Sequence, residues 1–225
     1  MASRTLVAYA LIWTLFASVP AARAVLLKEF RRFPAAVRGR FWMGLACGFV
    51  LVLLDAVIHV LGRAYSYAPT PIETLGLVVT LGWVILVACT EEMMVRGLLL
   101  TRLREVAGNI VAVASTALLF AVMHVGRLDF SMATATQYFA DGVFLGAITI
   151  LTGDIWSATG FHLAKNLWTS LAFGASHQFV PPLLAPRAGG IDTNVADLLA
   201  YVTVLPVSLL VFSLPKRRRR TDNSD

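Results

Sequence analysis

The chain has 225 residues, of which 58% are hydrophobic and only 14% are charged. Soluble domains carry roughly 45–50% apolar and about 25% charged residues, so the composition excludes an ordinary soluble domain and indicates a membrane protein. The net charge of +6 does not indicate a nucleic-acid partner, because ten of the nineteen Lys and Arg residues lie in two short segments that flank apolar stretches, five in 28–40 and five in 215–220.

The apolar stretches are long enough to cross a membrane, which takes about 20 mostly apolar residues per helix. In chain order the sequence predicts seven such helices: 5–25, 41–62, 75–100, 109–125, 135–152, 156–174 and 195–214. The loops between them are short, and the sequence contains no internal repeat and no soluble domain. We therefore expect an all-α, polytopic integral membrane protein that forms a single domain over residues 1–225.

The basic segments predict the orientation of the chain. Cytoplasmic loops carry an excess of Lys and Arg, and 28–40 and the tail 215–225 both lie inside when the N-terminus is out and the C-terminus is in. Residues 1–24 also resemble a cleavable signal peptide that ends in Ala-x-Ala. We favour an uncleaved first helix, because cleavage would leave the first basic segment outside unless the topology inverted. The expected location is the bacterial inner (cytoplasmic) membrane.

Ionisable residues occur inside these helices, where each costs at least ~2.5–3.5 kcal/mol and by default marks a function. The stretch "EEMMVR" ends with Arg96 and begins with Glu91 and Glu92. Glu92 and Arg96 are four residues apart, so they share a helix face and can pair. Glu91 lies about 100° away around the helix. It must therefore become protonated or find a basic group on another helix.

Two further motifs carry groups that could meet this demand. "FAVMH" places Phe120 and His124 on one face of the fourth helix, and "HLAKN" places His162 and Asn166 on one face of the sixth. A single histidine in an apolar helix is more often a packing residue than a functional one. Polar faces on three different helices nevertheless favour a common site.

The predicted depths of these groups in the membrane would let them meet, and together they suit one type of reaction. Glu91 and His124 lie at similar distances in sequence from Gly108, the centre of a predicted cytoplasmic turn, so they would meet in an antiparallel hairpin. A carboxylate and an imidazole can hold and deprotonate a water, while His162 and Asn166 could donate hydrogen bonds to an oxyanion. This set suits amide hydrolysis. Glu91, His124 and His162 also match a His₂Glu zinc ligand set, so a metal-activated water stays open.

The three motifs, in this order on successive predicted membrane helices, resemble those of the CPBP family. This family comprises the CAAX-processing and bacteriocin-related (Abi) intramembrane endopeptidases. The resemblance covers residues 75–174, the predicted catalytic core, and implies a glutamic-type protease that needs no cofactor. It implies two groups of site residues: the catalytic Glu91, His124, His162 and Asn166, and the supporting Glu92, Arg96 and Phe120.

The expected substrate is a membrane-anchored or lipidated protein or peptide, because so little of the chain lies outside the bilayer. CAAX-type, bacteriocin-type and C-terminal sorting-tail processing are all compatible with the sequence. Two other classes of function stay open. A proton-coupled transporter would also bury Glu, His and Arg, but the internal symmetry typical of transporters is not evident. A non-enzymatic immunity or scaffold protein would keep the fold without the reaction.

Other ionisable residues in the predicted helices belong to none of these motifs. Asp55 and His59 are four apart, which predicts an intrahelical hydrogen bond, with a supporting or substrate-gating role as the alternative. Asp141 is a candidate for the same cavity as the site. Lys165 is expected to pair with Asp154 or to face solvent.

Overall fold

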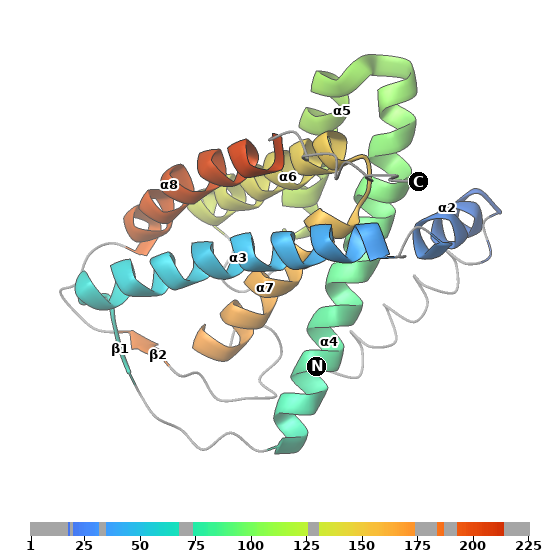
Figure 1. The fold of residues 1–225 in the computed structure, drawn as a ribbon. Coiled ribbons are helices and arrows are strands. Elements are labelled where there is room, and N and C mark those ends of the chain that lie inside the picture. Colours follow the sequence, from blue (N-terminus) through green and yellow to red (C-terminus); the bar gives the residue numbers. More distant parts are fainter. Residues whose placement is uncertain are drawn as a thin grey trace, which may run out of the picture.

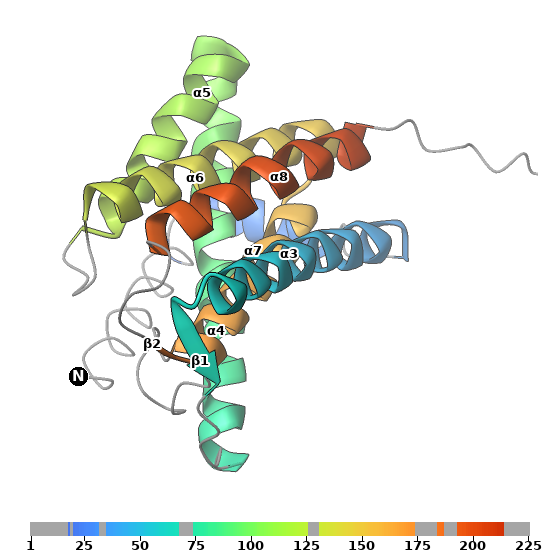
Figure 2. The same ribbon diagram turned by 90° about the vertical axis from the view of Figure 1, so that its left-hand side faces the viewer.

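The computed structural model describes residues 18, 20–31, 35–67, 74–125, 131–173, 184–186 and 193–213. This part of the chain is almost entirely helical (Figures 1 and 2), which confirms the all-α prediction. The helices are α2 (Pro20–Arg31), α3 (Ala35–Leu61), α4 (Thr74–Glu92), the π-helical segment η1 (Met93–Leu100), α5 (Thr101–Met123), α6 (Met132–Thr152), α7 (Trp156–Phe173) and α8 (Thr193–Ser213). Two short strands, β1 (Tyr65–Tyr67) and β2 (Leu184–Pro186), pair in antiparallel fashion.

Among the described residues, three helices are long and apolar enough to cross a membrane: Gly39–Leu61, Thr74–Met123 and Val195–Ser213. The second is 50 residues long and contains two of the predicted spans. Helices α6 and α7 coincide with two more predicted spans, but they carry several buried polar residues and are not in this set. The first predicted span lies mostly outside the described residues, as does the basic tail. The count of seven and the orientation therefore stay predictions.

The chain reverses its direction within α5, at Gly108. The backbone there has φ 77° and ψ 175°, a conformation that glycine adopts without steric cost. In Figure 1 this is the bend at the top of the green helices, from which the chain runs back down. This confirms the predicted turn. The remainder of α5 then packs against η1 and α6, which brings the second motif next to the first.

Helices α3 and α7 cross in direct backbone contact, because both present small residues at the crossing (Figure 1). A Cβ added at Gly44 would lie 2.0 Å from the Ser157 carbonyl oxygen, and one added at Gly160 would lie 2.2 Å from the Phe41 carbonyl oxygen. Gly44 and Gly48 have the small-xxx-small spacing that lets membrane helices approach closely. This contact holds α7, which carries the third motif, in the middle of the bundle.

We expect Gly44→Ala to destabilise the protein by about 1–3 kcal/mol, the usual cost of forcing an extra group into a packed interior. The matched control is Gly82→Ala on α4, where nothing lies within 4 Å of the added Cβ. The control should be neutral or slightly stabilising, since alanine favours helix over glycine. Denaturant unfolding in detergent micelles, followed by circular dichroism, measures both. Equal stability of the two variants would contradict the close crossing.

Candidate active site

The first motif lies at the junction of α4 and η1. Glu92 and Arg96 are both fully buried, and Arg96 Nη1 donates a hydrogen bond to Glu92 Oε1 at 2.9 Å, which confirms the predicted pair. Arg96 Nη2 also reaches the Gly142 carbonyl oxygen of α6, at 3.5 Å. The π-helical turn begins directly after Glu92. Such segments are rare in proteins and occur frequently at functional sites.

His162 of α7 lies between the two glutamates of the first motif. Its Nδ1 is 2.8 Å from Glu92 Oε1, and its Nε2 is 3.7 Å from Glu91 Oε2. All three residues are buried. Since a carboxylate accepts hydrogen bonds, Nδ1 donates to Glu92, and this bond orients the ring so that Nε2 faces Glu91. The sequence places His162 beside Asn166 as an oxyanion donor, but does not predict that His162 contacts both glutamates.

His124 lies at the C-terminal end of α5, where it contacts Phe120 and Tyr138. Its Nδ1 is 2.7 Å from the Phe120 carbonyl oxygen, so this nitrogen also donates. Its ring stacks on Tyr138 of α6, with centroids 3.9 Å apart and planes at 19°. Tyr138 was not predicted as a site residue, because a tyrosine in a membrane helix carries no distinctive pattern. Tyr138 limits how the imidazole can turn.

The Phe120 ring joins the three motifs. The Arg96 guanidinium carbon is 4.6 Å from its centroid, which is a cation–π geometry. The ring centroids of His124 and His162 lie 4.8 and 5.7 Å from it. The structure thus brings Glu91, Glu92, Arg96, Phe120, His124 and His162 together from three separate segments of the chain. Asn166 is half-buried on α7, one turn after His162.

The neighbouring polar residues of α7 are paired elsewhere. Lys165 forms an ion pair with the buried Asp141 of α6. The predicted pairing of Lys165 with Asp154 is therefore wrong. Asp154 instead pairs with Arg40 of α3. Lys165 lies on the face of α7 that turns toward α6 and α8, whereas Asp154 precedes α7 and faces the start of α3. Asp141 was a candidate for lining the cavity of the site, and in the structure its side chain pairs with Lys165.

Residues 73–168 match the family described as Rce1-like type II CAAX prenyl endopeptidases. This segment is Rce1-like. The Rce1-like segment contains all three motifs, from Glu91 to Asn166, and confirms the predicted resemblance to the CPBP family. Together with the apolar helices, it marks the chain as an integral membrane protein. No curated protein and no solved structure matched the chain.

Proposed function

We propose that the chain is an intramembrane endopeptidase of the bacterial cytoplasmic membrane. It would hydrolyse a peptide bond in a membrane-anchored or lipidated protein or peptide. The observation that carries the proposal is the buried contact of His162 with both Glu91 and Glu92, inside an Rce1-like segment. The family description, which names prenylated CAAX substrates, favours a lipidated C-terminal segment over the bacteriocin-type and sorting-tail alternatives.

In the proposed mechanism the two adjacent glutamates have different tasks. Glu92 is occupied, because its Oε1 accepts from both Arg96 and His162. Glu91 is the base, and with His124 it holds the attacking water. Glu91 takes one proton as the water oxygen bonds to the carbonyl carbon, and that proton later passes to the leaving amine nitrogen.

The oxyanion of the tetrahedral intermediate would be stabilised from α7. His162 and Asn166 are one helical turn apart, so the imidazole and the side-chain amide can approach one oxygen from the same side. Donors held in place in a water-poor site stabilise such an anion strongly, because they need no reorganisation during the reaction. In this role the His162 ring would carry a proton on both nitrogens, because Nδ1 donates to Glu92 and Nε2 would donate to the oxyanion.

Zinc is the alternative way to activate the water, although Glu91, His124 and His162 are not among the described residues whose ligand atoms already lie close enough together to share a metal ion. His124 and His162 each have Nδ1 held by an oxygen, which is the usual arrangement when Nε2 binds a metal. Glu91, His124 and His162 would hold the ion, which would lower the pKa of a bound water. Asn166 would still be available to donate to the oxyanion, whereas Glu91 and His162, as ligands, would not serve as base and oxyanion donor.

The test uses the purified full-length protein in proteoliposomes with a panel of peptides. Each peptide is offered prenylated, acylated or fused to a transmembrane anchor, and also without any anchor. We expect cleavage of anchored peptides only, with one ¹⁸O from labelled water at the new C-terminus and no loss of rate under chelator. Loss under chelator that zinc restores would favour the metal mechanism. Equal cleavage of anchored and free peptides would contradict the substrate class, and no cleavage of any peptide would favour a non-enzymatic role.

A further inference from the structure

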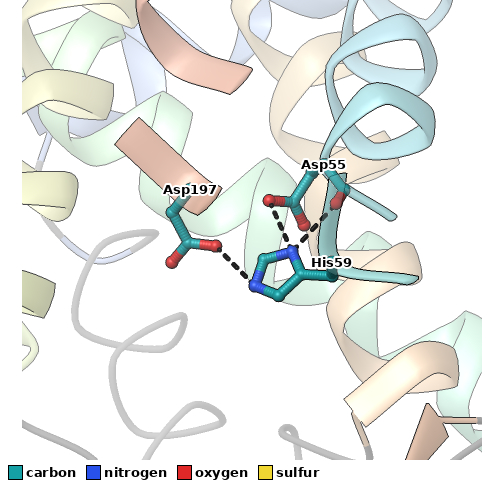
Figure 3. Close-up of side chains that lie close together, drawn as sticks. All are labelled: Asp55, His59 and Asp197. Atoms are coloured by element: carbon teal, nitrogen blue, oxygen red, sulfur yellow. Dashed lines mark hydrogen bonds and ion pairs between the residues drawn. The ribbon is translucent and has the colours of Figure 1, made fainter. Parts of the chain in front are cut away.

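A second group of polar side chains lies outside the Rce1-like segment. Asp55 and His59 are on the last turns of α3, and Asp197 is near the start of α8. Figure 3 shows the three side chains pointing toward one another from these two helices. One ligand atom from each, a histidine nitrogen or a carboxylate oxygen, lies within 4.8 Å of the other two. The predicted contact between Asp55 and His59 is confirmed, whereas Asp197 was not predicted.

The histidine is set up as a ligand rather than as a packing residue. His59 is 2% exposed, and its Nδ1 is 2.9 Å from the carbonyl oxygen of Asp55. A carbonyl only accepts, so Nδ1 carries a proton, and Nε2 is the nitrogen whose lone pair can bind a metal when the ring is neutral. This Nε2 is 3.3 Å from Asp197 Oδ1. A lone pair and a carboxylate oxygen repel each other unless a proton or a cation lies between them.

The two carboxylates have too little positive charge around them. In the part of the chain that the structure describes, no Lys or Arg pairs with Asp55 or Asp197, and the buried Asp55 Oδ1 lies 3.3 Å from His59 Nδ1 without a hydrogen bond of good geometry. The Gln137 amide donates to Asp197 Oδ2, which leaves Oδ1 directed at His59. Two carboxylates this close repel each other, and a shared proton or a bound cation relieves the repulsion.

We propose that Asp55, His59 and Asp197 bind one Zn²⁺ ion, which ties the end of α3 to the start of α8. Zinc accepts histidine nitrogen and carboxylate oxygen at about 2.0–2.2 Å in a tetrahedral arrangement, and two such ligands are then about 3.3–3.5 Å apart. The 3.3 Å between His59 Nε2 and Asp197 Oδ1 equals one edge of that tetrahedron. The Asp197 side chain is 26% exposed, so water can take the fourth position. We call this group the α3–α8 zinc site.

The backbone hydrogen bond of His59 has the role that such bonds have in metal sites. It fixes the tautomer and directs the metal-binding nitrogen, as the outer hydrogen bonds of zinc-binding histidines do. The site contains a single histidine. The alternative zinc site at Glu91 would contain two, His124 and His162, so the number of imidazoles on the ion tells the two sites apart. The α3–α8 zinc site does not depend on the proposed protease activity.

The first experiment measures zinc binding to the purified full-length protein in detergent, after metal removal by a chelator. We expect one Zn²⁺ per chain, a higher melting temperature with zinc, and at least ~10-fold weaker binding in Asp197→Asn and His59→Gln. The matched controls are Glu105→Gln, an exposed carboxylate, and His162→Gln. Both controls should bind zinc as the wild type does. Zinc that is lost in His162→Gln but kept in His59→Gln would overturn the proposal.

The second experiment needs no variant, so it does not depend on whether the substituted proteins fold. X-ray absorption spectroscopy of the zinc-loaded wild type should show one imidazole among light oxygen ligands. A shell with two imidazoles would overturn the proposal and place the ion at Glu91. A wild-type protein that retains no zinc would also overturn it, because His59 would then be held between the carboxylates by a proton instead.

Discussion

Glu91→Gln is expected to lower the rate of peptide cleavage by about 10²–10⁴-fold, the contribution of a positioned general base. The amide has the size of the carboxylate but cannot accept a proton. Glu91 is 7% exposed and its Oε2 faces His162 Nε2. A carboxylate dissolved in the buffer therefore cannot reach this position and act as the base in its place. The measurement is kcat/KM on the anchored peptide that the wild type cleaves best, with unfolding measured in parallel to show that the variant is folded.

Two control variants show whether the loss of rate is specific to the Glu91 carboxylate. Glu105→Gln removes an exposed carboxylate that pairs with Arg102, and should leave kcat/KM unchanged. Glu92→Gln removes the shared acceptor of Arg96 and His162, so it should lower stability as well as rate. Glu91→Gln should lower the rate alone. Wild-type activity in Glu91→Gln would show that the base has been assigned to the wrong residue.

Arg96→Met is expected to lower the free energy of unfolding by about 3–5 kcal/mol, the usual cost of removing one partner of a buried ion pair. The substitution leaves the Glu92 charge in a fully buried position without its guanidinium, and also removes the contact with the Phe120 ring. The matched control is Arg102→Met on the adjoining helix, where the side chain is 63% exposed. That control should change stability very little, because exposed pairs contribute little.

The double variant Glu92→Gln, Arg96→Met separates the charge from the packing. It should be more stable than Arg96→Met alone, because no unpaired charge is left buried. The difference from the sum of the two single variants measures the coupling of the pair. Reversible unfolding in mixed micelles gives all four values. If the two substitutions were simply additive, the pair would not interact as the structure indicates.

The sequence alone determined the features that depend on local rules. Composition indicated an all-α membrane protein, and the spacing of four residues predicted the contacts between Glu92 and Arg96 and between Asp55 and His59. The turn at Gly108 followed from a polar segment between two apolar ones. The three motifs indicated the family, and their order on separate helices indicated a common site. Each of these needs only helix geometry or the cost of burying charge.

Only the tertiary structure decided which groups meet across helices. It placed His162 against both Glu91 and Glu92, and paired Lys165 with Asp141 rather than Asp154. It also brought Asp197 to His59 from the far end of the sequence. Helix periodicity shows which residues share a face of one helix. The rotation and depth of that helix against its neighbours depend on packing, such as the direct α3–α7 contact at Gly44, and this packing selects the partner of each buried charge.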